Sequence, residues 1–108
     1  MPITPPTAVM KFADQDTPFT VTLALAGTEQ VLVAVPVGKK GRVISLVNDG
    51  PGTVALAFDQ VATVAGLNLK VGEAYSDASL EISTDVRFIN VTVGQTPIVR
   101  GVLWSGPA

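Results

Sequence analysis

Cysteine and histidine are both absent from this 108-residue chain. Their absence excludes disulfide scaffolds, cysteine nucleophiles, thiolate or imidazole metal sites and every catalytic triad that uses histidine. Charge is also scarce, because charged residues make up 15% of the chain, against about 25% in an average globular protein. The net charge of −2 offers no electrostatic basis for binding nucleic acid or an anionic membrane surface.

Long apolar segments are missing as well. The longest apolar run extends over seven residues, from Val31 to Val37, and is too short to cross a bilayer as a helix. The segment Met1–Thr7 has neither the basic start nor the apolar stretch of a secretory signal. We therefore expect a soluble protein that is made in the cytoplasm without cleavage.

β-branched residues, in contrast, are abundant. Seventeen Val, five Ile and eleven Thr supply 33 of the 108 residues, and these side chains favour a pleated, half-buried surface. Ten Gly and eight Pro interrupt the chain at short intervals. A partial helical pattern in residues 55–65 is outweighed by strict alternation over residues 53–58. The composition predicts an all-β fold.

Segments of alternating apolar residues recur along the chain, separated by turn residues about every 8 to 12 positions. This spacing is typical of an antiparallel sandwich or barrel, because a parallel sheet would need crossover helices. We expect strands at 19–26, 30–36, 42–48, 53–58, 80–83, 86–93 and 97–104, with 66–73 as a short strand or an extended loop. The predicted organisation is an extended N-terminal arm over residues 1–18 and a single antiparallel β-sandwich domain over residues 19–108.

The first twelve residues differ from the rest. Three prolines among the first six residues favour an extended backbone with few sheet hydrogen bonds. One interpretation is a frayed terminus. The other is an arm that packs on a neighbouring subunit, at a reduced entropic cost because proline already restricts its backbone. The apolar anchors of such an arm would be Ile3, Val9, Met10 and Phe12.

Acidic residues are the main candidates left for catalysis. Paired carboxylates can hydrolyse glycosides, but most of the nine acidic residues lie in turns, at strand ends or at polar strand positions, where carboxylates face water. Only Asp59, directly after Phe58, has no evident place. The segment Gly-Lys-Lys-Gly (38–41) lacks the spacing of a phosphate loop and predicts a solvated turn. We expect no catalytic residue, no metal site and no cofactor.

Several predicted strands carry apolar residues on both faces, which is more than one small core can hold. The side chains that alternation directs away from the core are Val43, Val47, Ile89, Ile98, Val102 and Trp104. A contiguous apolar patch marks an interface, and charged residues are depleted at interface cores. The candidate interface residues Ile98, Val102 and Trp104 therefore favour self-association over the alternative, a monomer with an unusually apolar surface.

From Gly41 onward the chain resembles a known family. The segments that carry the resemblance are Gly-Arg-Val-Ile-Ser-Leu-Val-Asn-Asp-Gly (41–50), Val-Ala-Leu-Ala-Phe-Asp (54–59), Gly-Leu-Asn-Leu-Lys-Val-Gly-Glu-Ala (66–74), Val-Arg-Phe-Ile-Asn-Val (86–91) and Val-Arg-Gly-Val-Leu-Trp (99–104). They are similar to the small β-sandwich structural proteins of tailed bacteriophages. That family combines an Asn-x-Gly hairpin, a strand ending in Asp, a Leu-x-x-Gly-Glu turn and a final strand similar to Val-x-Val-Leu-Trp. The Pro51-Gly52 pair in the hairpin departs from the pattern.

The resemblance implies a non-enzymatic virion component with a jelly-roll-like sandwich. Within that class we expect a capsid decoration (cement) protein, a homotrimer that binds the major capsid protein on the outer capsid surface. The N-terminal arm and the outward apolar residues are its expected contacts. The alternative is a receptor- or carbohydrate-binding module of a phage head or tail fibre, for which Tyr75 and Trp104 are the few aromatic candidates besides the phenylalanines.

Overall fold

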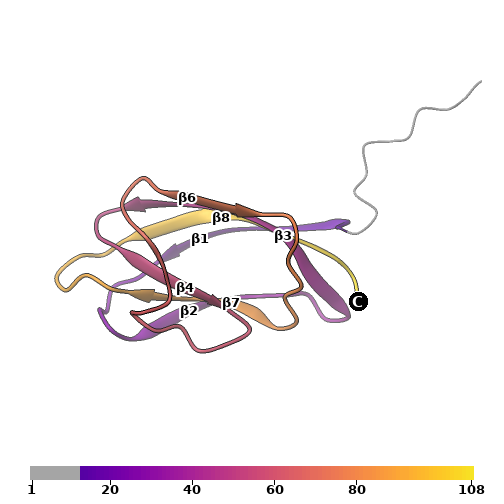
Figure 1. Cartoon of the computed structure of the whole chain (residues 1–108), viewed down its shortest axis with the longest axis horizontal. Coiled ribbons are helices and arrows are strands. Elements are labelled where there is room, and N and C mark those ends of the chain that lie inside the picture. The colour runs from indigo at the N-terminus through magenta and orange to yellow at the C-terminus, as the bar shows by residue number, and fades with distance from the viewer. Residues whose placement is uncertain (1–12) are drawn as a thin grey trace, which may run out of the picture.

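The computed structural model describes residues 13–108 as two four-stranded antiparallel sheets that pack face to face (Figure 1). The strands are β1 (Gln15–Thr22), β2 (Glu29–Ala34), β3 (Lys39–Gly50), β4 (Val54–Phe58), β5 (Leu67–Leu69), β6 (Ala74–Asp77), β7 (Asp85–Asn90) and β8 (Ile98–Pro107). The first sheet has the order β1-β8-β3-β6 and the second sheet has the order β2-β7-β4-β5. The predicted all-β sandwich is confirmed. The predicted arm residues Ile3, Val9, Met10 and Phe12 lie outside the described residues.

The strand pairing follows the jelly-roll order. β1 pairs with β8, β2 with β7, β3 with β6 and β4 with β5, as in one long hairpin that has been rolled up. The pairs β3–β8 and β4–β7 then complete the two sheets. Rolling places the β1–β2, β3–β4, β5–β6 and β7–β8 connections together at one end of the sandwich (Figure 1). We call this end, formed by residues 23–28, 51–53, 70–73 and 91–97, the loop end.

The core lies between the sheets and is built from the inward half of each alternating strand. Phe88 of β7 is fully buried and meets Phe19 of β1, with 5.8 Å between the ring centroids. Phe58 of β4 meets Tyr75 of β6 at 6.1 Å. Each pair joins the two sheets, and each large side chain buried in this way contributes about 1.5–3 kcal/mol to folding.

The first strand begins four residues earlier than the boundary that the sequence predicts, because Gln15 already pairs with Ser105 of β8. Leu23 N–H donates to Pro97 O across the continuation of the same ladder. Because N–H groups alternate in direction along an antiparallel strand, the nitrogen of Pro18 points to the free edge of the sheet, where no donor is needed. Proline therefore does not interrupt β1.

Three other expectations change. Lys39 and Lys40 form the start of β3 and pair with β8, so they are not part of a solvated turn. Residues 80–83 do not form a strand; Ile82 makes an isolated bridge to Gly41 and is buried. The short strand β6 has no counterpart among the predicted strands, since four residues are too few to produce a clear alternating pattern. In residues 13–108, no helix is long and apolar enough to cross a membrane.

Candidate functional site

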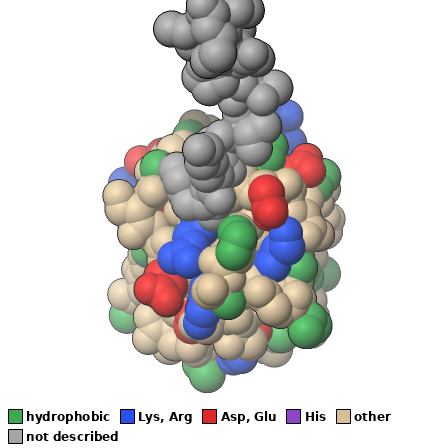
Figure 2. All heavy atoms as spheres, turned by 90° about the vertical axis from the view of Figure 1, so that its right-hand side faces the viewer, with side chains coloured by type: hydrophobic (Ala, Val, Ile, Leu, Met, Phe, Trp, Pro, Cys, Tyr) green, Lys and Arg blue, Asp and Glu red, His purple; other side chains and the backbone are tan. Residues whose placement is uncertain are grey.

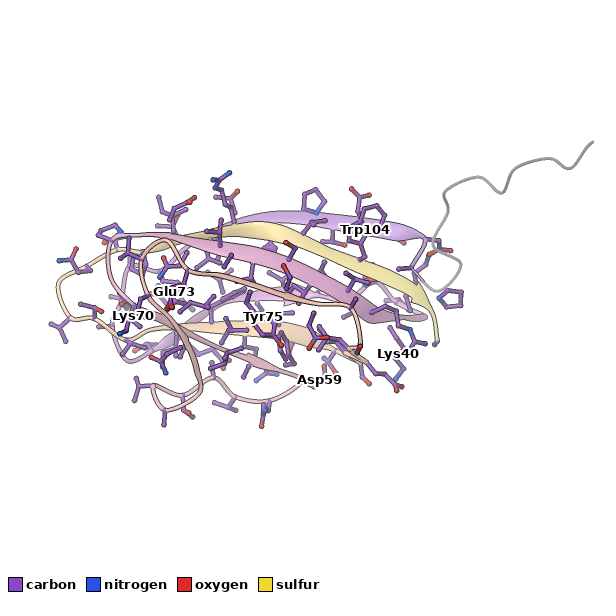
Figure 3. All side chains as sticks on the ribbon, turned by 45° about the horizontal axis from the view of Figure 1, so that its top comes forward. Lys40, Asp59, Lys70, Glu73, Tyr75 and Trp104 are labelled. Carbon is purple, nitrogen blue, oxygen red and sulfur yellow. The ribbon has the colours of Figure 1, made fainter. Side chains whose placement is uncertain are left out.

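The loop end presents large apolar side chains from three different connections. Val93 is 86% exposed, Leu25 is 59% exposed and Val71 is 57% exposed. The charged residues of the four connections are Lys70 and Glu73, which lie at this end in Figure 3. The backbone N–H of Lys70 donates to the Glu73 carboxylate over 2.6 Å, which holds this carboxylate against its own turn. The loop end thus exposes three large apolar side chains together with one lysine and one glutamate.

Asn48, at the end of β3, holds two of these connections together. Its buried side-chain amide donates to Gly52 O and Leu69 O, each over 2.9 Å, and its Oδ1 accepts from Gly50 N–H over 2.8 Å. Its backbone carbonyl accepts from Gly72 N–H over 2.7 Å. These bonds join the β3–β4 and β5–β6 connections.

Asn90, at the end of β7, does the same for the other two connections. Its side-chain amide donates to Leu23 O over 3.1 Å and to Gln95 O over 2.7 Å, while its Oδ1 accepts from Thr92 N–H over 2.9 Å. Both asparagines have no exposed surface, so removing either amide would leave several buried groups without partners. Sequence reasoning missed both roles, although the Asn-x-Gly pattern at 48–50 is a turn signal.

The sequence-predicted interface residues lie on the outer face of the first sheet. Alternation along β8 directs Ile98, Val102 and Trp104 away from the core, as predicted, and Leu103 between them is fully buried. Trp104 lies on the outer side of this sheet in Figure 3. Ile98 is 37% exposed, whereas Val102 and Trp104 are half-buried by their neighbours within the sheet.

Cross-strand neighbours group the outward side chains of the first sheet into rows. Each row is given in the strand order β1, β8, β3 and β6, and the first row has no member on β6. The rows are Asp16–Trp104–Val43, Pro18–Val102–Ser45–Ser76 and Thr20–Arg100–Val47–Ala74. We call these three rows, together with Ile98 and Asp49, the open face. Its middle row is apolar or small, and its charged residues are Asp16 on the edge strand β1, Arg100 on the interior strand β8 and Asp49 near the end of β3.

The open face is hollowed beside Arg100. A shallow hollow of about 570 Å³ has Gly101 in its floor and small side chains, such as Ser45 and Ala74, in its walls. Arg100 at its rim pairs with Asp49, with Nε and Oδ2 2.5 Å apart. The Arg100 side chain is 64% exposed and the Asp49 side chain is 36% exposed, so solvent screens this pair and it adds little to stability.

The part of the second sheet's outer face that lies over β4 and β7 is covered by the chain itself. Ala62, in the β4–β5 connection, packs on Ala55, Ala57 and Ile89 and forms a second buried cluster with them. The Ala62 N–H donates to Glu29 Oε2 over 2.7 Å and fixes the connection in place. Ile89 is 5% exposed, so the expectation that it faces solvent or a partner is wrong.

Asp59 anchors the start of that connection at the end of the sandwich opposite the loop end. Its carboxylate accepts three backbone N–H groups, those of Ser83, Thr84 and Asp85, over 2.6–3.2 Å. Burial alone would raise the pKa of Asp59, but these donors and the nearby Lys40 hold it below its usual value. Figure 3 shows Lys40 and Asp59 at this end, and Figure 2 shows acidic and basic side chains gathered there.

The expectation that acidic residues at strand ends face water is wrong for Asp85. It is buried, and its carboxylate accepts from Arg87 Nε over 2.9 Å, so it does not lie on a solvated surface. The hydrogen bond with Asp85 raises the pKa of Arg87 above its ordinary value.

Among residues 13–108, no group of three or more acidic side chains is placed to hold a metal ion. A scan against protein-family models finds no match for this chain, and a search of the curated proteins finds none.

Proposed function

We propose that this chain is a non-enzymatic structural protein of a bacteriophage virion. Its role in this proposal is that of a capsid decoration (cement) protein, which binds the outer surface of the major capsid shell and stabilises it. The observation that carries the proposal is that two of the segments that resemble phage structural proteins lie next to each other in the fold. The Asn-x-Gly turn at 48–50 and the Gly-Glu turn at 72–73 are far apart in the sequence, yet they are hydrogen-bonded to each other at the loop end.

The loop end is the proposed contact with the shell. Its exposed residues Leu25, Val71 and Val93 would each contribute about 1.5–3 kcal/mol when buried, before ordering costs are subtracted. Those costs are small here, because Asn48 and Asn90 already fix the connections that carry the three side chains. Many copies on one shell then multiply a modest affinity per contact.

The sequence-predicted arm is a separate proposed contact. The described chain begins at Ala13, near Lys39 and Asp14, whose side chains pair over 2.5 Å at the end opposite the loop end. A contact made by residues 1–12 and a contact made by the loop end can therefore be removed independently.

Co-sedimentation with capsids assembled without this chain tests the proposal. The wild type is expected to pellet with the shells. A variant with Leu25→Ser, Val71→Ser and Val93→Ser should bind at least about tenfold more weakly, since a tenfold loss needs only about 1.4 kcal/mol.

A matched control uses three exposed valines away from the loop end. Val37, Val61 and Val64 are 103%, 65% and 51% exposed, and replacing all three with Ser should leave capsid binding unchanged. Equal binding by the two triple variants would reject the loop end as the contact. A wild type that stays in the supernatant would reject capsid decoration.

The hollow on the open face favours one second candidate, a carbohydrate-binding module. Ser45, Thr20 and Arg100 line the hollow with polar groups, and Trp104 lies on the same face. A glycan array separates the two candidates: decoration predicts no bound glycan, whereas a signal that Trp104→Ala removes would favour carbohydrate binding.

A further inference from the structure

The open face supports an inference that does not depend on the virion proposal. We propose that it binds the open face of a second copy of this chain, giving a two-fold symmetric dimer. The outward apolar residues of the sequence predict self-association, and the arrangement of charge on this face specifies how two copies meet.

The free sheet edges are poorly suited to joining two copies. β5 has three residues and β6 has four, so either edge offers few backbone groups for pairing. The longer edge strand, β1, directs the nitrogen of Pro18 outward and therefore lacks a donor in its middle. β2 has a register shift between Glu29 and Val31, which also disfavours extension of the sheet. The sheet edges are therefore less suited to joining two copies than the open face is.

Charge on the open face selects the orientation of the second copy. A two-fold axis along β8 would place Arg100 against Arg100 of the other copy, which like-charge repulsion disfavours. An axis that crosses the strands at Val102 instead places the row of Arg100 against the row of Trp104, since the two rows lie equally far from Val102. Arg100 of each copy then faces the row that holds Asp16 of the other copy.

Three contacts follow from that orientation. The Arg100 guanidinium of each copy pairs through Nε with Asp49 of its own chain. Its remaining N–H groups approach the indole of Trp104 and the carboxylate of Asp16 in the other copy, and a cation over an indole is attractive within about 6 Å. The bulky Trp104 faces the hollow beside Arg100. Val43 of one copy lies against Val47 of the other, because they occupy the same two rows on β3.

The area of the face sets the strength of the dimer. The four strands of the first sheet have 8, 12, 4 and 10 residues. At about 3.3 Å per residue and about 4.8 Å between strands, the outer face of the sheet measures roughly 500 Å² per copy. Two copies would bury about 1,000 Å² in total, which is near the lower limit for a specific interface. We therefore expect a reversible dimer that dissociates on dilution. The homotrimer expected from the sequence would need a different contact, since a face that binds itself is complete with two copies.

Sedimentation equilibrium from about 10 µM to about 500 µM measures the association, in the affinity range expected of such an interface. The wild type should shift from monomer to dimer over this range. Arg100→Glu places two carboxylates together across the interface, and Asp16→Arg places two cations together, so each variant alone should associate at least about tenfold more weakly.

Mixing the two variants is the decisive arm of the experiment. In a mixed dimer the glutamate introduced at position 100 of one chain faces the arginine introduced at position 16 of the other. The unchanged Asp16 of the first chain faces the unchanged Arg100 of the second, so both contacts become attractive. The mixture should recover the dimer that neither variant forms alone. Leu32→Asp, on the outer side of β2 and 50% exposed in the wild type, is the control and should dimerise normally.

Circular dichroism and thermal melting verify that each variant is folded, and Trp104→Ala replaces any charge variant that is not. A wild type that remains monomeric at the highest concentration would overturn the proposal. It would also be overturned by a trimeric mass, by unchanged association of both charge variants, or by a mixture that stays monomeric while the wild type dimerises.

Discussion

The two outer faces of the sandwich differ in what covers them. On the second sheet, the β4–β5 connection places Ala62 over Ala57 and Ile89 and buries them. On the first sheet, the outward residues Val102 and Trp104 belong to no buried cluster of the described chain. The same chain therefore encloses one apolar face and leaves a similar one open, which is the arrangement expected when a partner supplies the missing cover.

The largest difference in stability is expected between two variants that carry a new aspartate, one on each face. Ile89→Asp forces a carboxylate beneath the β4–β5 connection and should cost about 3–5 kcal/mol of unfolding free energy. Val102→Asp places the charge on the open face and should cost less than about 1 kcal/mol, because surface substitutions are mild. Urea unfolding of the two variants at a concentration where the wild type is monomeric measures both values. Similar losses in both variants would show that the open face is in fact covered.

Opening the cover on the second sheet should have an intermediate effect. Ala62→Asp disturbs the packing on Ala57 and Ile89 and should cost about 1–3 kcal/mol by overpacking. The newly exposed apolar surface should bind a hydrophobic dye, whereas Leu32→Asp on the same sheet should not increase dye binding. An Ala62→Asp variant with wild-type stability and dye binding would mean that the connection does not protect this face.

Acid should loosen the covered side of the molecule. Asp59 anchors the start of the β4–β5 connection, and its pKa in the folded state lies below the usual value of 3.8. The folded state therefore binds fewer protons, so this carboxylate stabilises the fold above about pH 4, and the contribution is lost as the pH falls below the usual pKa.

Asp59→Asn should accordingly cost about 1 kcal/mol near neutral pH, a modest value because the side chain is exposed. The variant should lose less stability than the wild type between about pH 4 and about pH 2. Thermal melting across this range, with Glu81→Gln as a control for an exposed acidic residue, measures the difference. Parallel pH curves for Asp59→Asn and the wild type would contradict the assigned role.

The smallest effect on stability is expected from deleting residues 1–12. If the sequence-predicted arm is an attachment segment, the deletion should reduce capsid co-sedimentation and change the melting temperature by less than about 2 °C, which corresponds to a few tenths of a kcal/mol for a domain of this size. A large fall in melting temperature would instead identify the segment as part of the domain.

The sequence predicted the fold class and the outward direction of Ile98, Val102 and Trp104, because strict alternation along a strand is readable without tertiary information. It could not distinguish Ile89 from these residues. Both kinds of position alternate in the same way, and only the path of the β4–β5 connection decides that Ile89 is buried.

The asparagines of the loop end show a second limit. Asn48 and Asn90 look like ordinary turn residues, and their partners lie up to 67 positions away in the sequence. Hydrogen bonds of that separation depend on the rolled topology, which places the ends of β3 and β7 beside the other connections. Local propensity therefore located the turns but not the bonds that join them.

The contrast between the two faces is tested most directly by amide chemical shifts recorded over a concentration series from about 10 µM to about 1 mM, a range that brackets weak association. We expect concentration-dependent shifts at Trp104, Val102 and Val47 on the open face, and constant shifts at Ala57 and Ile89 on the covered face. Spectra that do not change with concentration, or shifts of equal size on both faces, would contradict the contrast.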